Sequence, residues 1–479
     1  MVSWSSVNFY KLLFVELFFR NGLRLALFFA VMAGATQVKL DCNGFVDAAL
    51  SNDPQVYETS LGLESKRIKL DQIVADAIMP KFQVEMAFGP APGLKRVVEN
   101  AGDTVNAWDF SKIGPYFGTQ IDAAQPLNLG QLRTGLRTAR ADLEQKQWEI
   151  QGSRIQKAAE YQRYYYGFLL AIEMHRIANE ASENFQKAQD RLQAKLDSAE
   201  DDEDSGKKSV VSQDDLLMLK AGRFEVDKAV ADAESGLQKA ELAIRFSLRL
   251  AETDTFATKD SSLIERPELL PPLDTLKRWL KSVNPDMQRM HAGVNALEGQ
   301  VRLAEEGMGP QFFIFGSFTY AKSWAGDRRA LSSNAFAQDP VNTLTGSLGI
   351  GLRYNLNYWS ALQKVRLAKA DFRQLKAKDN YALDGLLLQL EVQYSEFIAS
   401  RNKLESARKS LRATEALLKG AAMRFDVDPS ESTKLIEAYK RDILMQKDFY
   451  FALYDYNVSV ANLLAKIGIG PAEIPRSSL

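Results

Sequence analysis

The chain contains one sequence pattern twice, and this duplication limits its possible folds more than any other feature. Pro54 in "SNDPQVYETS" has a counterpart 231 positions later in "KSVNPDMQRM", and Pro80 recurs 230 positions later as Pro310. From there the spacing settles at 229, as shown by Leu127-Asn128 with Leu356-Asn357, Ala141-Asp142 with Ala370-Asp371, and Tyr165 and Phe168 with Tyr394 and Phe397. Because the matches keep their order and nearly constant spacing, we interpret the chain as a tandem duplication.

Each copy contains two segments with the alternating pattern of half-buried strands. The predicted outward-facing side chains are Phe82, Val84, Met86 and Phe88, then more weakly Phe117 and Ile121, in the first copy, and Phe312, Ile314, Phe318, Tyr320, Leu348, Ile350, Leu352 and Tyr354 in the second. Polar or small residues alternate with most of them. We therefore predict one β-hairpin per copy, at about 80–126 and 311–356, with long polar loops near 90–114 and 323–343.

Long helices are predicted for most of the remaining chain. Residues 129–195 and 358–423 contain no proline, and about 66 helical residues would extend for roughly 100 Å. Shorter helices are expected at 44–78, 213–250, 272–307 and 432–468. Apolar residues in 213–250 recur at alternating spacings of three and four, which is typical of a coiled coil. A soluble helical bundle would explain this stripe equally well, but it would not explain the hairpins.

The N-terminus has the features of a secretory signal peptide at residues 1–35. Arg20 and Arg24 precede an apolar run of eleven residues that ends in Ala33-Gly34-Ala35. This run is shorter than the roughly 20 residues of a membrane-spanning helix. An uncleaved anchor helix would need the earlier apolar stretch, which Glu16 interrupts. The chain has a single cysteine, Cys42, so we expect no disulfide framework. The residues before it, Lys39-Leu40-Asp41, lack the small side chains of a lipoprotein cleavage site, so we expect no lipid anchor.

No pattern in the sequence indicates an enzyme. His175 and His291 are far apart, with no cysteine or second histidine nearby, so we expect them to be ordinary helix residues and predict no metal site. Phosphate-binding loops, dinucleotide-binding glycine patterns and nucleophile elbows are absent from the sequence. The formal net charge of −1 gives no indication of a nucleic-acid partner. We therefore expect no catalytic residue and no cofactor.

Four strands cannot close a barrel, and an isolated hairpin is marginal in water. Strands with one apolar and one polar face suit an outer-membrane barrel, where lipid forbids open sheet edges. Three chains would supply twelve strands. The expected fold is thus mainly α with a small β part: duplicated long helical hairpins and two β-hairpins that complete a 12-stranded barrel in a homotrimer. The two repeats are expected at 36–265 and 266–470, followed by a tail at 471–479.

Several motifs in about residues 44–470 resemble the TolC family of outer-membrane efflux proteins. They are the helix-to-strand junctions "NDP…MPKF" and "VNP…GPQF", the segments "QPLNLG" and "YNLNYW" that enter the long helices, and "YYYGF" and "QYSEF" within those helices. This resemblance implies a homotrimer with a barrel in the outer membrane of a Gram-negative bacterium and a helical tunnel in the periplasm. It also implies docking to a periplasmic adaptor and to an inner-membrane pump or ABC transporter.

By the same resemblance, the turns between long and return helices form the periplasmic tip that docks those partners. The residues that match this tip are Arg191, Leu192 and Asp215 in the first repeat, and Arg424, Phe425 and Asp428 in the second. Two features depart from the family pattern. Asp428 stands where glycine is expected, and the acidic insertion 197–206, "DSAEDDEDSG", is either a solvated loop or a charged label for the adaptor or pump.

The resemblance also places a gate near the start of the last helix, where the family has a ring of acidic side chains. Glu437 falls at one ring position and Lys434 at the other, where the acidic residue is missing. Three copies of Glu437 would attract cations, and Lys434 could provide a counter-charge. The alternative is that both are ordinary solvent-facing residues.

The expected function is a passive duct for efflux of small molecules, driven by the inner-membrane partner. The same fold serving type I protein secretion is an alternative that the sequence does not separate. An exported structural coiled coil without a pore is a further alternative, although it would have no use for strands with apolar outer faces.

Overall fold

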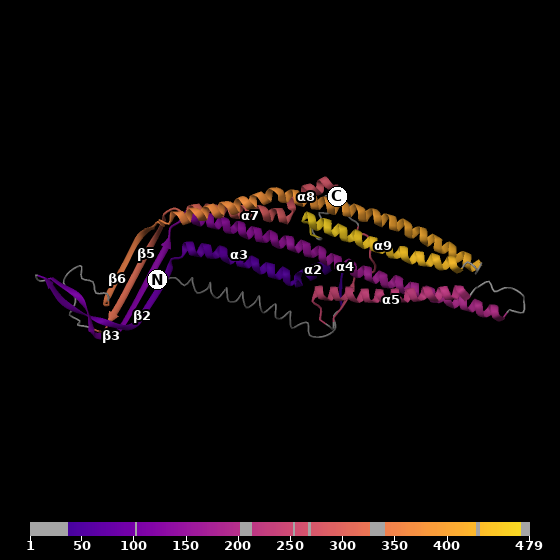
Figure 1. The fold of residues 1–479 in the computed structure, drawn as a ribbon, viewed down its shortest axis with the longest axis horizontal. Coiled ribbons are helices and arrows are strands. Elements are labelled where there is room, and N and C mark those ends of the chain that lie inside the picture. The colour runs from indigo at the N-terminus through magenta and orange to yellow at the C-terminus, as the bar shows by residue number, and fades with distance from the viewer. Residues whose placement is uncertain are drawn as a thin grey trace, which may run out of the picture. The chain divides into compact units, whose positions relative to one another are not determined.

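The computed structural model describes residues 37–100, 103–201, 213–251, 254–266, 270–325, 341–427 and 432–470 (Figure 1). The expected signal peptide, residues 202–206 of the acidic insertion, Asp428 and the C-terminal tail lie outside these residues. The described elements are β1 (Gln37–Leu40), α2 (Cys42–Asn52), α3 (Pro54–Ile78), β2 (Lys81–Asn100), β3 (Asp103–Pro126), α4 (Leu129–Asp201), α5 (Gln213–Leu248), β4 (Thr255–Thr258), α6 (Leu273–Val283), α7 (Pro285–Glu306), β5 (Gln311–Ser323), β6 (Thr343–Arg353), α8 (Tyr358–Val427) and α9 (Ser432–Ile467).

The chain divides into two compact units. We call Gln55–Ser153 with Lys277–Gln389 the sheet unit; the helical unit comprises Met1–Pro54, Arg154–Leu276 and Leu390–Leu479. The long helices α4 and α8 each begin in the sheet unit and end in the helical unit. Each repeat therefore contributes strands and helices to the sheet unit, and the end of its long helix with its return helix to the helical unit; the first repeat also adds β1, α2 and β4 to the helical unit.

The sheet unit contains a four-stranded antiparallel sheet in the order β2-β3-β5-β6 (Figure 1). This confirms the prediction of two β-hairpins. The hairpins are joined because β3 pairs with β5 over Tyr116–Pro126. The second repeat thus supplies a strand partner for the first hairpin within the same chain.

The prediction of a polar loop at residues 90–114 is wrong. β2 and β3 stay paired from Lys81↔Ala124 to Asn100↔Asp103, far beyond the ends of β5 and β6. A register shift follows Pro92, where the pairing moves from Ile113 to Asp109. Prolines are tolerated at such irregularities in a strand, so Pro90 and Pro92 do not end β2, although they favoured the prediction of a loop. The extra residues are held locally, since the backbone N–H of Ser111 donates to Asp109 Oδ1 at 3.2 Å.

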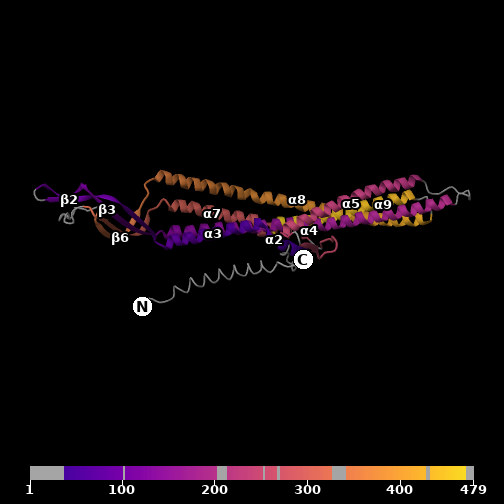
Figure 2. The ribbon, with the colours of Figure 1, turned by 90° about the horizontal axis from the view of Figure 1, so that it is seen from below.

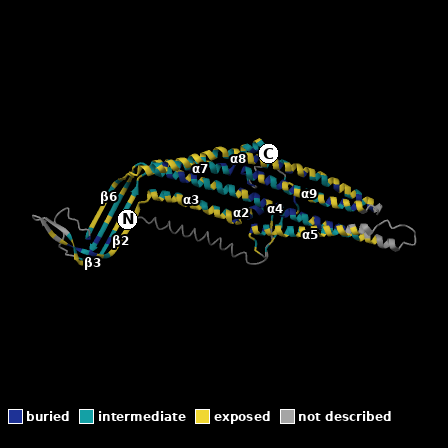
Figure 3. Cartoon of the chain, viewed as in Figure 1, coloured by how far each residue is buried: buried dark blue, intermediate teal, exposed yellow. Residues whose placement is uncertain are grey.

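The register gives the sheet one apolar and one polar face, as predicted. Val84, Ile121 and Phe318 share a row on the apolar face, which the described residues leave largely exposed, with Leu348 at 84%. Gln83, Asp122, Ser317 and Ser347 share a row on the opposite face. Figure 3 shows exposed residues along β2 and β6, the two outer strands.

The shorter helices of the sheet unit pack against the first parts of α4 and α8. Lys66 on α3 forms an ion pair with Asp142 on α4 at 3.2 Å. A Cβ atom at Gly299 on α7 would overlap the side chain of Thr138 on α4, so glycine permits this close approach. Lys369 on α8 forms an ion pair with Glu305 on α7 at 2.6 Å.

Two helices that were expected to be continuous are each broken before a proline. The helix predicted at 44–78 is divided into α2 and α3 at Pro54, and the helix predicted at 272–307 is divided into α6 and α7 at Pro285. Proline lacks an N–H and restricts the preceding residue, so it suits the first turn of a new helix. Asn284 caps α7, because its side-chain oxygen accepts from the N–H groups of Asp286 at 2.9 Å and Met287 at 3.1 Å.

The helical unit contains a small parallel sheet of β1 and β4, which was not predicted from the sequence. Beside it, Phe45 on α2 packs against Tyr165 on α4 and Phe256 on β4, at centroid distances of 5.7 and 5.9 Å. The phenol of Tyr165 donates to Asp260 Oδ2 at 2.6 Å. On α9, the fully buried Asn457 donates to the carbonyl of Ile264 at 2.9 Å. These contacts fix the segment between α5 and α6.

Candidate functional site

Five of the six predicted tip residues lie near the ends of the described helices of the helical unit: Arg191 and Leu192 in α4, Asp215 in α5, and Arg424 and Phe425 in α8. Arg191 is exposed near the end of α4, and Arg424 is exposed in the last turn of α8. Leu192 and Asp215 lie in α4 and α5, but their side chains are outside the described part of the structure, as is the whole of Asp428. Two cationic side chains of the expected docking surface, Arg191 and Arg424, are therefore exposed to solvent.

Phe425 has a different environment from the one expected of a docking residue. Its side chain is 7% exposed and packs with Ala421, Leu435 and Ala438 in a cluster between α8 and α9. Its ring therefore holds the end of this hairpin together.

The predicted gate residues belong to an exposed strip on α9. Lys434 and Glu437 are both exposed, and the strip continues at spacings of three and four through Arg441, Leu444, Asp448 and Phe451. Helical residues at these spacings share one face. Arg441 was not predicted from the sequence, although it lies four residues after Glu437 and therefore on the same face of a helix. Glu437 thus has a cationic residue one turn before it and another one turn after it.

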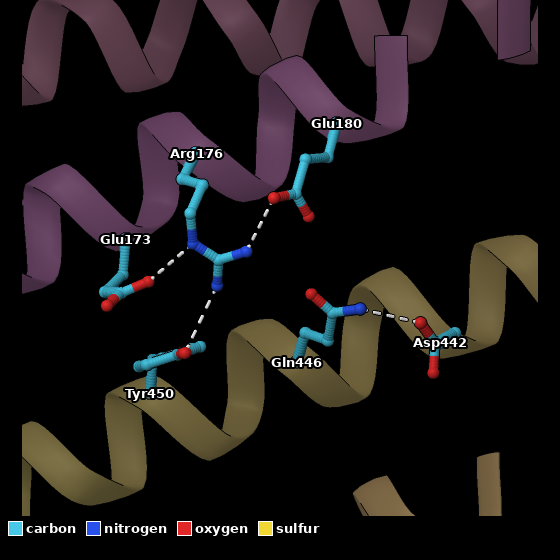
Figure 4. Close-up of polar contacts among 6 residues, drawn as sticks. All are labelled: Glu173, Arg176, Glu180, Asp442, Gln446 and Tyr450. Carbon is cyan, nitrogen blue, oxygen red and sulfur yellow. Dashed lines mark hydrogen bonds and ion pairs between the residues drawn. The ribbon is translucent and has the colours of Figure 1, made fainter. Parts of the chain in front are cut away.

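A polar network joins α4 to α9 (Figure 4). Arg176 on α4 donates to Glu173 at 2.9 Å, to Glu180 at 2.8 Å and to the hydroxyl of Tyr450 on α9 at 3.2 Å. Burial opposes the charge of Arg176, but the hydrogen bonds to Glu180 and Glu173 outweigh it and raise its pKa. Burial also raises the pKa of Tyr450. Because Glu173 is only 3% exposed, Arg176 is needed to offset the cost of its buried charge.

A second buried carboxylate, that of Asp442, lies on α9 before Tyr450. Asp442 is 5% exposed and accepts from Gln446 at 2.7 Å, while its Oδ1 has no hydrogen-bond partner among the described residues (Figure 4). Neither this carboxylate nor the Arg176 network was predicted. Buried charged residues interrupting an apolar helix face are the signal that could have identified both.

An apolar cavity of about 410 Å³ lies among α4, α5 and α9. It is lined mainly by small and aliphatic side chains, with Asp232 and Lys447 as its charged members. Nearby, α9 is tied to α5 by an ion pair between Lys440 and Glu225 at 3.1 Å. Figure 2 shows these three helices lying side by side.

Neither a metal centre nor a helical membrane anchor is found in the described part of the chain. No three or more His, Cys, Asp or Glu side chains there lie close enough to hold a metal ion. No described helix is both long enough and apolar enough to cross a membrane.

Comparisons by sequence found no matching family model and no similar curated protein. Comparisons by structure did find matches. The outer-membrane channel OprN has a TM-score of 0.67 and 18% identity, with 90% of each chain covered. The Campylobacter jejuni CmeC outer membrane channel has a TM-score of 0.67 and 16% identity, covering 90% of this chain and 87% of that one. The open-state MtrE outer membrane channel of Neisseria gonorrhoeae has a TM-score of 0.66 and 12% identity, covering 90% and 89%. The chain therefore has the fold of these outer-membrane channel proteins.

Proposed function

We propose that the chain is one subunit of a homotrimeric channel in the outer membrane of a Gram-negative bacterium. The observation that supports this most directly is the sheet, which exposes a continuous apolar face and has two outer strands, β2 and β6, without a further partner among the described strands. In lipid, an open edge leaves backbone groups without hydrogen bonds, so the sheet must be closed. Three copies give twelve strands, an even number within the range of such barrels.

The long helices support a duct that continues beyond the membrane. α4 has 73 residues and α8 has 70, so each would measure roughly 100 Å or more along its axis. This is several times the ~30 Å of a bilayer core. We infer that the helices of three chains form a passive tunnel, which a periplasmic adaptor connects to an energy-supplying inner-membrane pump or ABC transporter. No bond chemistry and no cofactor is part of this function.

Small-molecule efflux is the use of the duct that we propose, in keeping with the resemblance of the sequence motifs to outer-membrane efflux proteins. Type I protein secretion through the same duct remains the alternative. A structural rod without a pore is less favoured, because a rod in water would gain nothing from the exposed apolar face of the sheet.

The proposal is tested by fractionating cells that produce the chain and by recording currents from the purified protein in planar bilayers. We expect it in the outer-membrane fraction and expect stepwise increases in conductance. A protein that stays soluble and monomeric without detergent, and gives no current, would contradict the proposal.

A further inference from the structure

Two phenylalanines interrupt the polar face of the sheet. Most side chains on this face of β5 and β6 are small or carry hydroxyls, as in the hydrogen bond between Ser317 and Ser347 at 2.7 Å. Phe313 and Phe315 share that face, because they lie four and two residues before Ser317 on the same strand. Their rings are 6.0 Å apart and remain partly exposed.

Glycines on β6 make room for both rings. Gly351 is the register partner of Phe313, and Gly349 is the partner of Phe315. A Cβ atom at Gly351 would lie 2.5 Å from Cζ of Phe313, and one at Gly349 would lie 3.0 Å from Cζ of Phe315. The rings therefore lie along the glycine backbone, where they present aromatic surface without projecting far from the sheet.

A cationic side chain, that of Arg353, lies beside the ring of Phe313. The guanidinium carbon of Arg353, the last residue of β6, is 5.2 Å from the ring centroid of Phe313. Arg353 is exposed and forms no ion pair within the described part of the chain. A planar guanidinium beside an aromatic ring can bind a carboxylate or sulfonate while the ring stacks on the rest of the ligand.

The other charged groups on this face have partners of their own. Lys81, at the start of β2, shares the row of Phe315, and forms an ion pair with Asp76 at 3.4 Å. The acidic residues Asp122 and Glu85 lie further along the sheet, and each accepts a hydrogen bond from a glutamine side chain. Because Asp76 offsets the charge of Lys81, Arg353 is the cation at this end of the sheet that forms no ion pair within the described part of the chain.

We propose that Phe313, Phe315 and Arg353 form a contact site for small aromatic anions inside the channel. This inference rests on the proposed function, because the polar face becomes the wall of the bore only in a closed barrel. Three copies would place three such sites around the bore, at the end where it meets the helical tunnel. The class of cargo that fits is a flat aromatic ring carrying one carboxylate or sulfonate.

The test uses the assembled full-length protein in planar bilayers, with 1-naphthalenesulfonate as the probe. We expect a reversible, concentration-dependent reduction of current. Methanesulfonate, which has the charge without the ring, and 1-naphthylmethylammonium, which has the ring with the opposite charge, should be much weaker. Equal block by the two naphthyl compounds would overturn the charge assignment and with it the proposal.

Matched variants locate the site. Phe315→Leu and Arg353→Gln should each raise the half-blocking concentration roughly fivefold, the effect of losing one stacking or cation contact. Phe318→Leu, on the same strand but the opposite face, should leave it unchanged. If Phe315→Leu fails to assemble, the half-blocking concentration of Arg353→Gln decides whether the site exists. Arg353 is exposed, so its replacement should leave assembly intact.

The outcomes separate this inference from the proposed function. A protein that conducts but is not blocked by the probe, or is blocked equally in all variants, overturns the contact site only. A protein that gives no current overturns the channel and the site together.

Discussion

Ile350 and Ser347 lie on the same strand and on opposite faces of the sheet, so they test the assignment of the faces residue by residue. In the proposed barrel, Ile350→Arg places a charge in lipid, at a cost of about 2–4 kcal/mol near the midplane and less near the interfaces. We expect this variant to reduce the assembled protein recovered from outer membranes. Ser347→Arg, on the polar face, should reduce it little. Equal loss from both substitutions would mean that the faces are assigned wrongly.

Cys42, at the first residue of α2, gives a prediction about pH. Burial raises the pKa of its thiol from an ordinary value of 9.0 to about 11, and a hydrogen bond with Tyr166 offsets part of this rise. Below pH 9 the folded protein should therefore hold about a hundredfold less thiolate than the unfolded chain and react with iodoacetamide correspondingly more slowly. The free energy of unfolding should also fall as the pH rises from about 9 to 11, because over this range the thiol loses its proton more readily in the unfolded chain than in the folded protein.

Cys42→Ser provides the control for that prediction. The fall in the free energy of unfolding between pH 9 and 11 should be smaller in this variant. Equal alkylation rates for folded and unfolded wild-type protein at pH 8 would contradict the burial of the thiol.

At the scale of elements, local periodicity was enough to predict the four long or return helices and the two hairpins. Local periodicity did not predict strands whose structure depends on pairing with another segment of the chain. β2 and β3 continue past Pro90 and Pro92 because each strand supplies hydrogen bonds to the other, whereas the local sequence there is typical of a loop. β1 and β4 are four-residue strands that pair across more than 200 residues, so neither has a local signal.

The candidate site was predictable to the same extent. The helix period predicts that Lys434 and Glu437 share one face of α9, and both are exposed there; their role as a gate stays a prediction. The contact of Arg176 with Tyr450 was not predictable, because it depends on how α4 packs against α9.

The exposed strip on α9 leads to a prediction about ion selectivity. If the strip faces the axis of a trimer, Glu437 supplies its only acidic group between Lys434 and Arg441. Glu437→Gln should then remove three negative charges from the tunnel, weaken any block by divalent cations and shift the reversal potential in a salt gradient toward anion selectivity. Both effects should diminish at high ionic strength.

The charge-matched control is Glu183→Gln, an exposed residue of α4. If Glu183→Gln shifts the reversal potential as much as Glu437→Gln does, the strip does not line the narrowest part of the tunnel.

At the scale of the whole molecule, the central claim is that three chains complete one barrel. The outer strands β2 and β6 are separated by β3 and β5, so they lie three strand spacings apart, or roughly 14 Å. A disulfide needs Cα atoms closer than about 7 Å, so it cannot join β2 to β6 within one chain. Between neighbouring chains in a closed barrel, residues on these two strands would lie opposite each other.

Disulfide formation between β2 and β6 therefore tests the claim most directly. In a Cys42→Ser background, cysteines are introduced in pairs, one at Gln83 or Glu85 and the other at Thr345 or Ser347. After oxidation in outer membranes, we predict that at least one pair gives covalent dimers and trimers on a denaturing gel, with no larger product. Variants with a single introduced cysteine should give no trimer. A ladder that continues past three chains, or no cross-linked product from any pair, would contradict a barrel completed by three copies.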